Sequence, residues 1–237
     1  MKQFNIKTAA LMAAIVSAFA APAQATIVIS EVNAWSSGSG NSPYQADWFE
    51  LTNTGASAVN IGGWKVDDNS NSFADALALT GVTSIAAGQS VVFIEVGSST
   101  TAATVNASFI STWFGAIPPS TFVIGNYSGA GIGFSQTADA VNIYDAAGTL
   151  QANVTFGASD NVTPRQTFDN AAGLNNTAIS QLSVVGVKGA FVAVNDINEI
   201  GSPGAIAPVP EPGEYAMLLA GLVVVAGIAR RRGVQFS

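Results

Sequence analysis

The chain has 237 residues, of which 10% are charged, and it contains neither cysteine nor histidine. These absences exclude disulfides, thiol catalysis and thiolate metal sites, and they remove the usual general base of serine triads and the commonest zinc ligand. Residues 26–212 contain three basic and fourteen acidic residues, a net charge of −11, which disfavours binding to DNA, RNA or anionic lipid headgroups.

Residues 1–25 have the three parts of a secretory signal peptide. A positively charged start precedes an apolar run at residues 9–21, and Ala23-Gln24-Ala25 is a small-x-small cleavage site. The apolar run is shorter than the about 20 residues of a membrane-spanning helix, so an uncleaved anchor is the less favoured alternative. The sequence predicts handling by the general secretion machinery, with Ala23 and Ala25 marking the cut and Thr26 beginning the mature chain.

Short runs with strand character recur between turn signals through the middle of the chain. The run at residues 48–52 alternates, with Phe49 and Leu51 on one face and Glu50 and Thr52 on the other. Short strands at this spacing, with few charged residues, favour an all-β sandwich or barrel. The expected strands are residues 27–32, 48–52, 61–66, 77–79, 90–96, 121–124, 141–144, 150–156 and 191–194.

Glu31 and Glu50 lie in the first two expected strands. Glu50 stands beside the turn at residues 53–55, where its carboxylate could accept N–H bonds from a neighbouring loop. We interpret both glutamates as structural or solvated, and the alternative is that they act as ligands or catalytic acids. Glycoside hydrolysis needs two carboxyl groups at a defined separation, which the sequence does not establish.

A polar loop follows the expected strand that contains Trp64. It holds the densest group of oxygen ligands in the chain, and hard cations such as calcium bind carboxylates and amide carbonyls from one loop. The EF-hand spacing with its terminal glutamate is absent, so a polar turn and a calcium site both stay open. The candidate ligands are Asp67, Asp68, Asn69 and Asn71.

One helical stretch is expected at residues 107–114. Phe109, Ile110 and Trp113 recur there at helical spacing. We expect this helix to pack on the core or to close one end of the sandwich. The Thr-rich segment that precedes it, residues 98–107, gives no clear secondary-structure signal.

Several segments in order resemble the lamin tail domain family. They are Ile29-Ser30-Glu31-Val32 and the stretches at residues 47–55, 59–64, 85–92 and 139–145. The resemblance covers about residues 26–157 and implies an immunoglobulin-like β-sandwich. Trp64 would fill its core. Residues 201–204 are similar to the closing segment of bacterial members that carry a sorting tail. Lamin tail domains accompany enzymes in other bacterial proteins, but too few residues are left here for a separate catalytic domain.

The C-terminal region has three parts in fixed order. Val209-Pro210-Glu211-Pro212 is stiff and incompatible with a helix, residues 216–229 are continuously apolar, and Arg230, Arg231 and Arg232 follow. The apolar run is somewhat short for a full span, but flanking Tyr215 and the arginines can lie in the membrane interfaces. By the positive-inside rule, the arginines keep the domain outside.

This order resembles the PEP-CTERM sorting tail of Gram-negative bacteria. The resemblance implies recognition by an exosortase, a membrane protease-transpeptidase that would cut near Pro210-Glu211-Pro212, commonly in bacteria that make exopolysaccharide. A plain single-span anchor after a proline-rich linker is the alternative.

Three regions are therefore expected: a signal peptide at residues 1–25, a lamin-tail-like sandwich at 26–205, and a sorting tail with a single transmembrane helix at 206–237. The expected function is that of an exported surface or extracellular-matrix protein, associated with exopolysaccharide or biofilm and transiently anchored in the inner membrane. Its domain would have a binding or structural role in the matrix, without catalysis and without a cofactor. The alternatives are a calcium- or carbohydrate-binding module and an extracellular hydrolase. Expected partners are the exosortase, the secretion machinery and an exopolysaccharide or surface component, but no nucleic acid.

Overall fold

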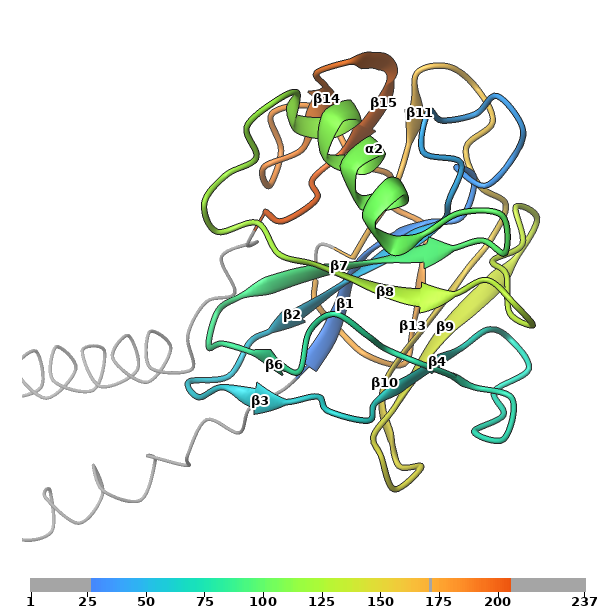
Figure 1. The fold of residues 1–237 in the computed structure, drawn as a ribbon, viewed down its shortest axis with the longest axis vertical. Coiled ribbons are helices and arrows are strands. Elements are labelled where there is room, and N and C mark those ends of the chain that lie inside the picture. Colours follow the sequence, from blue (N-terminus) through green and yellow to red (C-terminus); the bar gives the residue numbers. More distant parts are fainter. Residues whose placement is uncertain (1–26, 171, 206–237) are drawn as a thin grey trace, which may run out of the picture. The chain divides into compact units, whose positions relative to one another are not determined.

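The structure is a computed structural model that describes residues 27–170 and 172–205 (Figure 1). The expected signal peptide and sorting tail lie outside the described residues, together with Ala23, Ala25, Val209, Pro210, Glu211, Pro212, Arg230, Arg231 and Arg232. Within the described part of the chain, no helix is long and apolar enough to cross a membrane.

Two five-stranded sheets form the body of the domain (Figure 1). The first sheet has the order β12-β1-β2-β7-β8 and the second β13-β10-β9-β4-β5. Only the pairs β7–β8 and β10–β13 within these two sheets are parallel. The strands of the first sheet are β1 (Ile27–Asn33), β2 (Trp48–Asn53), β7 (Ser90–Val96), β8 (Ile124–Ser128) and β12 (Phe168–Asp169). Those of the second are β4 (Lys65–Asp67), β5 (Leu77–Ala78), β9 (Asp139–Tyr144), β10 (Leu150–Phe156) and β13 (Thr177–Ile179). The predicted all-β sandwich is confirmed.

A further layer covers the outer face of the first sheet. It consists of α2 (Ala102–Phe114) and a three-stranded sheet of β11 (Arg165–Gln166), β15 (Asp196–Gly201) and β14 (Phe191–Ala193). A small sheet of β3 (Val59–Asn60) and β6 (Ser84–Ile85) completes the fold.

The first sheet is therefore buried on both faces. Phe49 of β2 belongs to the core shared with the second sheet, whereas its neighbour Trp48 packs with Phe109 and Trp113 of α2. This explains the continuous apolar run of β7, because a strand between two cores has no solvent-facing side.

The helix is longer than predicted. It begins at Ala102, and Thr101 caps it by accepting a hydrogen bond from Thr104 N at 3.3 Å. Part of the Thr-rich segment is thus helical. The buried side chains of the helix include Val105, Phe109 and Trp113. They pack in a core with the first sheet, so the first of the two expected roles, core packing, is confirmed, and the helix covers a sheet face instead of an end of the sandwich.

Some strand boundaries also differ from the prediction. The expected strand at residues 61–66 begins only at Lys65, because Ile61 to Trp64 form a turn in which Gly63 has a positive φ of 79°. Trp64 is nevertheless buried in the core, as predicted. The expected strand at residues 121–124 begins only at Ile124.

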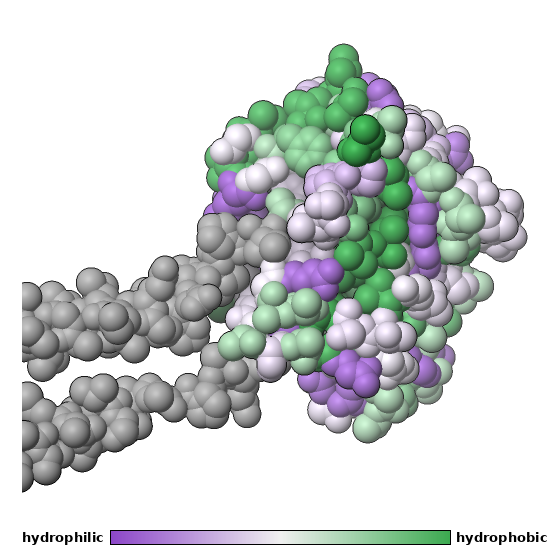
Figure 2. All heavy atoms as spheres, turned by 60° about the vertical axis from the view of Figure 1, so that its left-hand side comes forward, coloured by the Kyte–Doolittle hydropathy of each residue, from purple (hydrophilic) through white to green (hydrophobic). Residues whose placement is uncertain are grey.

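Exposed hydrophobic side chains gather over β14, β15 and the end of α2, at the top of Figure 2. Ile117, Val194 and Ile197 are 84%, 60% and 77% exposed. The tip of the β14–β15 hairpin lies against the helix end, since Val194 N donates to Trp113 O at 3.2 Å.

Candidate functional site

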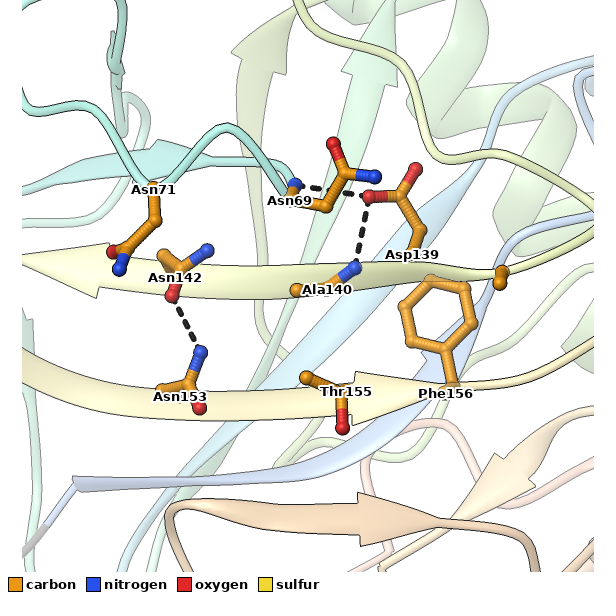
Figure 3. A pocket seen from close by; sticks show the side chains of 9 residues that line it. Asn69, Asn71, Asp139, Ala140, Asn142, Asn153, Thr155 and Phe156 are labelled. Atoms are coloured by element: carbon orange, nitrogen blue, oxygen red, sulfur yellow. Dashed lines mark hydrogen bonds between the residues drawn. The ribbon is translucent and has the colours of Figure 1, made fainter.

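An open groove lies on the outer face of the second sheet, beside the loop that follows β4 (Figure 3). Its volume is about 500 Å³. Five of the nine residues that line it carry amide or carboxyl side chains, from β9, β10 and the loop (Figure 3), although the larger part of the lining surface is apolar. The lining residues are Asn69, Asn71, Ala138, Asp139, Ala140, Asn142, Asn153, Thr155 and Phe156.

Strand alternation and register create the floor of the groove. Val141 and Ile143 of β9 point into the core, so Asn142 between them faces outward. Asn142 lies directly opposite Asn153 of β10 and also pairs with Asp67 of β4. Its Oδ1 accepts a hydrogen bond from Asn153 Nδ2 at 2.5 Å (Figure 3). Its Nδ2 donates to Asp68 O at 2.5 Å. These bonds hold the floor in one geometry.

The loop at residues 67–72 forms one wall. Asp67 is buried, and its Oδ2 accepts hydrogen bonds from Ser70 Oγ at 2.7 Å and Ser72 N at 2.6 Å. Asn71 Oδ1 accepts a hydrogen bond from Tyr144 OH at 2.5 Å. The loop is thus fastened to itself and to β9.

Asp139 closes the end of the groove. Its Oδ1 accepts hydrogen bonds from Asn69 N at 2.9 Å and Ala140 N at 2.8 Å (Figure 3). Its Oδ2 accepts one from Ser135 N at 2.5 Å. Both carboxylate oxygens are therefore engaged in holding backbone.

The four predicted calcium ligands have different environments in the structure. Asp67 Oδ2, Asp68 Oδ1 and Asn71 Oδ1 accept hydrogen bonds within the domain, while the side chain of Asn69 is exposed. Asp67 Oδ1 is buried without a hydrogen-bond partner among the described residues. Residues 27–170 and 172–205 contain no group of three or more His, Cys, Asp or Glu side chains that could hold a metal ion. Both alternatives for this loop, the polar turn and the calcium site, remain predictions, and its hydrogen bonds favour the polar turn.

The chain matches one protein family over more than half of its length. The family is the Lamin Tail Domain, and the match covers residues 20–158. The chain belongs to the lamin tail domain family. The matched region includes every strand and loop of the groove. No curated protein matches the chain significantly.

The lamin tail domain is an immunoglobulin-like binding or structural domain and not a known catalytic family. In this member, the strands from β11 to β15 follow the matched region. These strands and the residues after them place a second group of polar residues against β1 and β2 of the first sheet, away from the groove.

Two carboxyl groups are buried under the C-terminal end of this lamin tail domain. Glu31 and Glu50 are each 1% exposed and lie opposite each other on β1 and β2. Glu31 accepts hydrogen bonds from Thr167 Oγ1, from Ser202 N at 2.8 Å and from Ser202 Oγ at 3.0 Å. Glu50 accepts hydrogen bonds from Ser30 Oγ at 2.7 Å and Gly204 N at 2.5 Å. The expected backbone N–H bond to Glu50 is present, and its donor is in the C-terminal segment.

Burial raises the pKa of both carboxyl groups. The pKa of Glu31 rises from 4.5 to about 7, because loss of water outweighs the hydrogen bonds from Thr167 and Ser202. The pKa of Glu50 rises from 4.5 to about 8, because burial is joined by repulsion from Glu31. Neither group is accessible to a substrate, so both have a structural role.

The sequence did not predict the buried hydrogen-bond network around Tyr44. Tyr44 OH donates to Glu199 Oε2 at 2.8 Å and accepts from Trp48 Nε1 at 3.2 Å and Trp113 Nε1 at 3.3 Å. Burial raises the pKa of Glu199 to about 7. The network joins β2, α2 and β15, and a pair such as Tyr44 and Glu199, separated by 155 residues, gives no local sequence signal.

Proposed function

We propose that this lamin tail domain protein is exported and processed by an exosortase, and that it functions at the cell surface or in an exopolysaccharide-containing matrix. Its domain would bind or support other matrix components without catalysis. The observation that supports this proposal most is the order of the tail: Val209-Pro210-Glu211-Pro212, the apolar residues 216–229, and Arg230, Arg231 and Arg232. The signal peptide ending at Ala25 supplies the matching export signal.

The state of the acidic residues favours binding over hydrolysis. A glycoside hydrolase needs two carboxyl groups that flank the substrate. Glu31, Glu50 and Glu199 are buried, and Asp139 at the groove uses both oxygens to hold backbone N–H groups. The chain also has no histidine or cysteine to act as a base or nucleophile.

The last contacts of the domain lie before the proposed cutting site, as expected for a protein whose tail is removed. The segment 202–204 is fastened to Glu31 and Glu50, and Ala205 stands only five residues before Pro210. A cut near Pro210 would therefore leave the fastening of the domain intact.

Fractionation of the native host tests this proposal. In an exosortase-carrying strain, we expect the protein outside the cell or on its surface. In the strain that lacks the exosortase, we expect it in the membrane fraction at a larger mass. Equal distribution and equal mass in the two strains would contradict the proposal.

A replacement of Glu211 provides the matched control. Glu211→Ala should reproduce the exosortase deletion, since it alters the Pro-Glu-Pro segment. Glu214→Ala changes an acid only three residues away but outside this segment, and we expect normal processing.

A further inference from the structure

We propose that the groove between the loop at residues 67–72 and strand β10 binds a segment of uncharged polysaccharide. This inference rests on the proposed function, because it gives the matrix-binding domain a site and a class of ligand.

The lining of the groove contains both hydrogen-bond donors and hydrogen-bond acceptors. Each asparagine side chain supplies donors and an acceptor, and the threonine hydroxyl supplies one of each. In the described part of the chain, the side chains of Asn69 and Thr155 have no hydrogen-bond partner, and both residues are exposed. Closely spaced sugar hydroxyls, which donate and accept together, match such a lining.

The charge of the lining selects against anionic ligands. Asp139 is the charged residue among the nine that line the groove, and none of the nine is basic. Residues 26–212 as a whole carry −11. Phosphates, nucleic acids and acidic polysaccharides would meet repulsion without a compensating cation.

The groove is also unsuited to a peptide that would bind as an added strand. A peptide that adds a strand needs an unpaired strand edge, but β9 lies between β10 and β4, and β10 lies between β13 and β9. The lining has more apolar than polar surface, and Ala138, Ala140 and Phe156 contribute to it. An uncharged glycan fits both parts, because its hydroxyls can bind the polar groups while its C–H groups contact the apolar surface.

Part of the lining is held in place before any ligand arrives. Asn142 is fixed by Asn153 and Asp68, and Asn71 by Tyr144. Little side-chain entropy is therefore lost at these positions on binding. The volume of about 500 Å³ lies within the range of small-ligand sites, about 300–1,000 Å³.

The test is affinity electrophoresis of the secreted protein in gels that contain one polysaccharide each. The uncharged probes are laminarin, dextran and xylan, and alginate is the anionic comparison. The test variant is Asn69→Ala with Thr155→Val, which removes two exposed polar groups and keeps the β-branched residue on the strand. The control is Asn198→Ala with Thr121→Val, which makes the same changes at exposed positions outside the groove lining.

We expect at least one uncharged polymer to retard the wild-type protein and the control variant equally. The groove variant should bind that polymer about tenfold more weakly, as expected from the loss of two neutral hydrogen bonds. Thermal melting should show that both variants remain folded.

The inference is overturned if none of the uncharged polymers retards the protein, if alginate alone does, or if the groove variant binds as tightly as the control. The mass and location of the native protein are measured separately. Failure of glycan binding by a correctly processed protein would therefore reject the groove alone, and failure of export would reject the proposed function.

Discussion

Glu31 and Glu50 lie opposite each other on neighbouring central strands, and the same C-terminal segment donates a backbone N–H to each carboxyl group. The first two strands of the domain are thereby joined to its last described residues. Because these carboxyl groups are buried, their protonation is linked to the stability of the whole domain.

The first prediction concerns pH. Burial raises the pKa of Glu31 and Glu199 to about 7 and that of Glu50 to about 8. It also raises to about 7 the pKa of Asp47, which is 1% exposed and accepts hydrogen bonds from Ser37. The folded state therefore holds these protons more tightly than the unfolded chain, in which the pKa values are 3.8 for Asp and 4.5 for Glu. This stabilisation is full below the unfolded pKa values and is lost as the pH rises through 7 to 8.

Urea unfolding between about pH 5 and pH 8 checks this prediction. We expect the free energy of unfolding to fall by more than about 1 kcal/mol, because one pKa unit corresponds to about 1.4 kcal/mol. A domain that is most stable at pH 8 and weakens toward pH 5 would show that the buried carboxyl groups are not the dominant titrating groups.

The second prediction concerns Glu50. Glu50→Gln keeps an acceptor for Gly204 N but cannot ionise, and Ser30 can reverse its hydroxyl to accept from the new amide. We expect a flatter dependence of stability on pH, with a gain over the wild-type protein at pH 8. Glu50→Ala is the contrasting variant, since it leaves buried donors unpaired and should cost about 1–3 kcal/mol at every pH. Equal pH profiles for wild type and Glu50→Gln would sink this explanation.

The third prediction concerns the network around Tyr44. Tyr44→Phe leaves Trp48 Nε1 and Trp113 Nε1 without this acceptor and removes a donor to Glu199. We expect a loss of about 1–3 kcal/mol in the free energy of unfolding, with a change in tryptophan fluorescence. Tyr144→Phe, which removes a hydroxyl bonded to Asn71 at the groove, is the comparison and should leave the fluorescence unchanged. An undiminished stability of Tyr44→Phe would contradict the assigned role.

The fourth prediction concerns calcium. Asp67 Oδ2 and Asn71 Oδ1 already accept hydrogen bonds within the domain. We therefore expect millimolar calcium to leave the melting temperature unchanged. Asp67→Ala with Asp68→Ala should lower that temperature equally with and without the ion. If calcium raised the melting temperature of the wild-type protein but not that of this variant, the loop would be a calcium site and the prediction would be wrong.

The sandwich could be predicted because its signals are local. The alternation around Phe49 and Leu51 and the segments similar to lamin tail domains mark the strands directly. The start of α2 gave no such signal, because the Thr-rich sequence before Ala107 lacks the usual charged or apolar pattern of a helix. Strand β14 is among the expected strands, whereas the short strands β11, β12 and β13 pair with distant partners. Residues 165–169 and 177–179 have no alternation long enough to recognise.

The groove could be predicted only in part. The sequence indicated the polar loop at residues 67–71, but the facing pair Asn142 and Asn153 depends on a register shift between Leu150 and Ala152. Without this bulge, counting back from the hairpin loop would place Ala152 opposite Asn142. The contacts of Glu31 with Ser202 span 171 residues, so only the folded chain shows them.

The most direct measurement is the intact mass of the protein recovered from outside an exosortase-carrying host. The proposed function predicts a chain that begins at Thr26 and ends near Pro210. A chain that still contains residues 216–237 would be a permanently anchored protein, and it would contradict processing at the Pro-Glu-Pro segment.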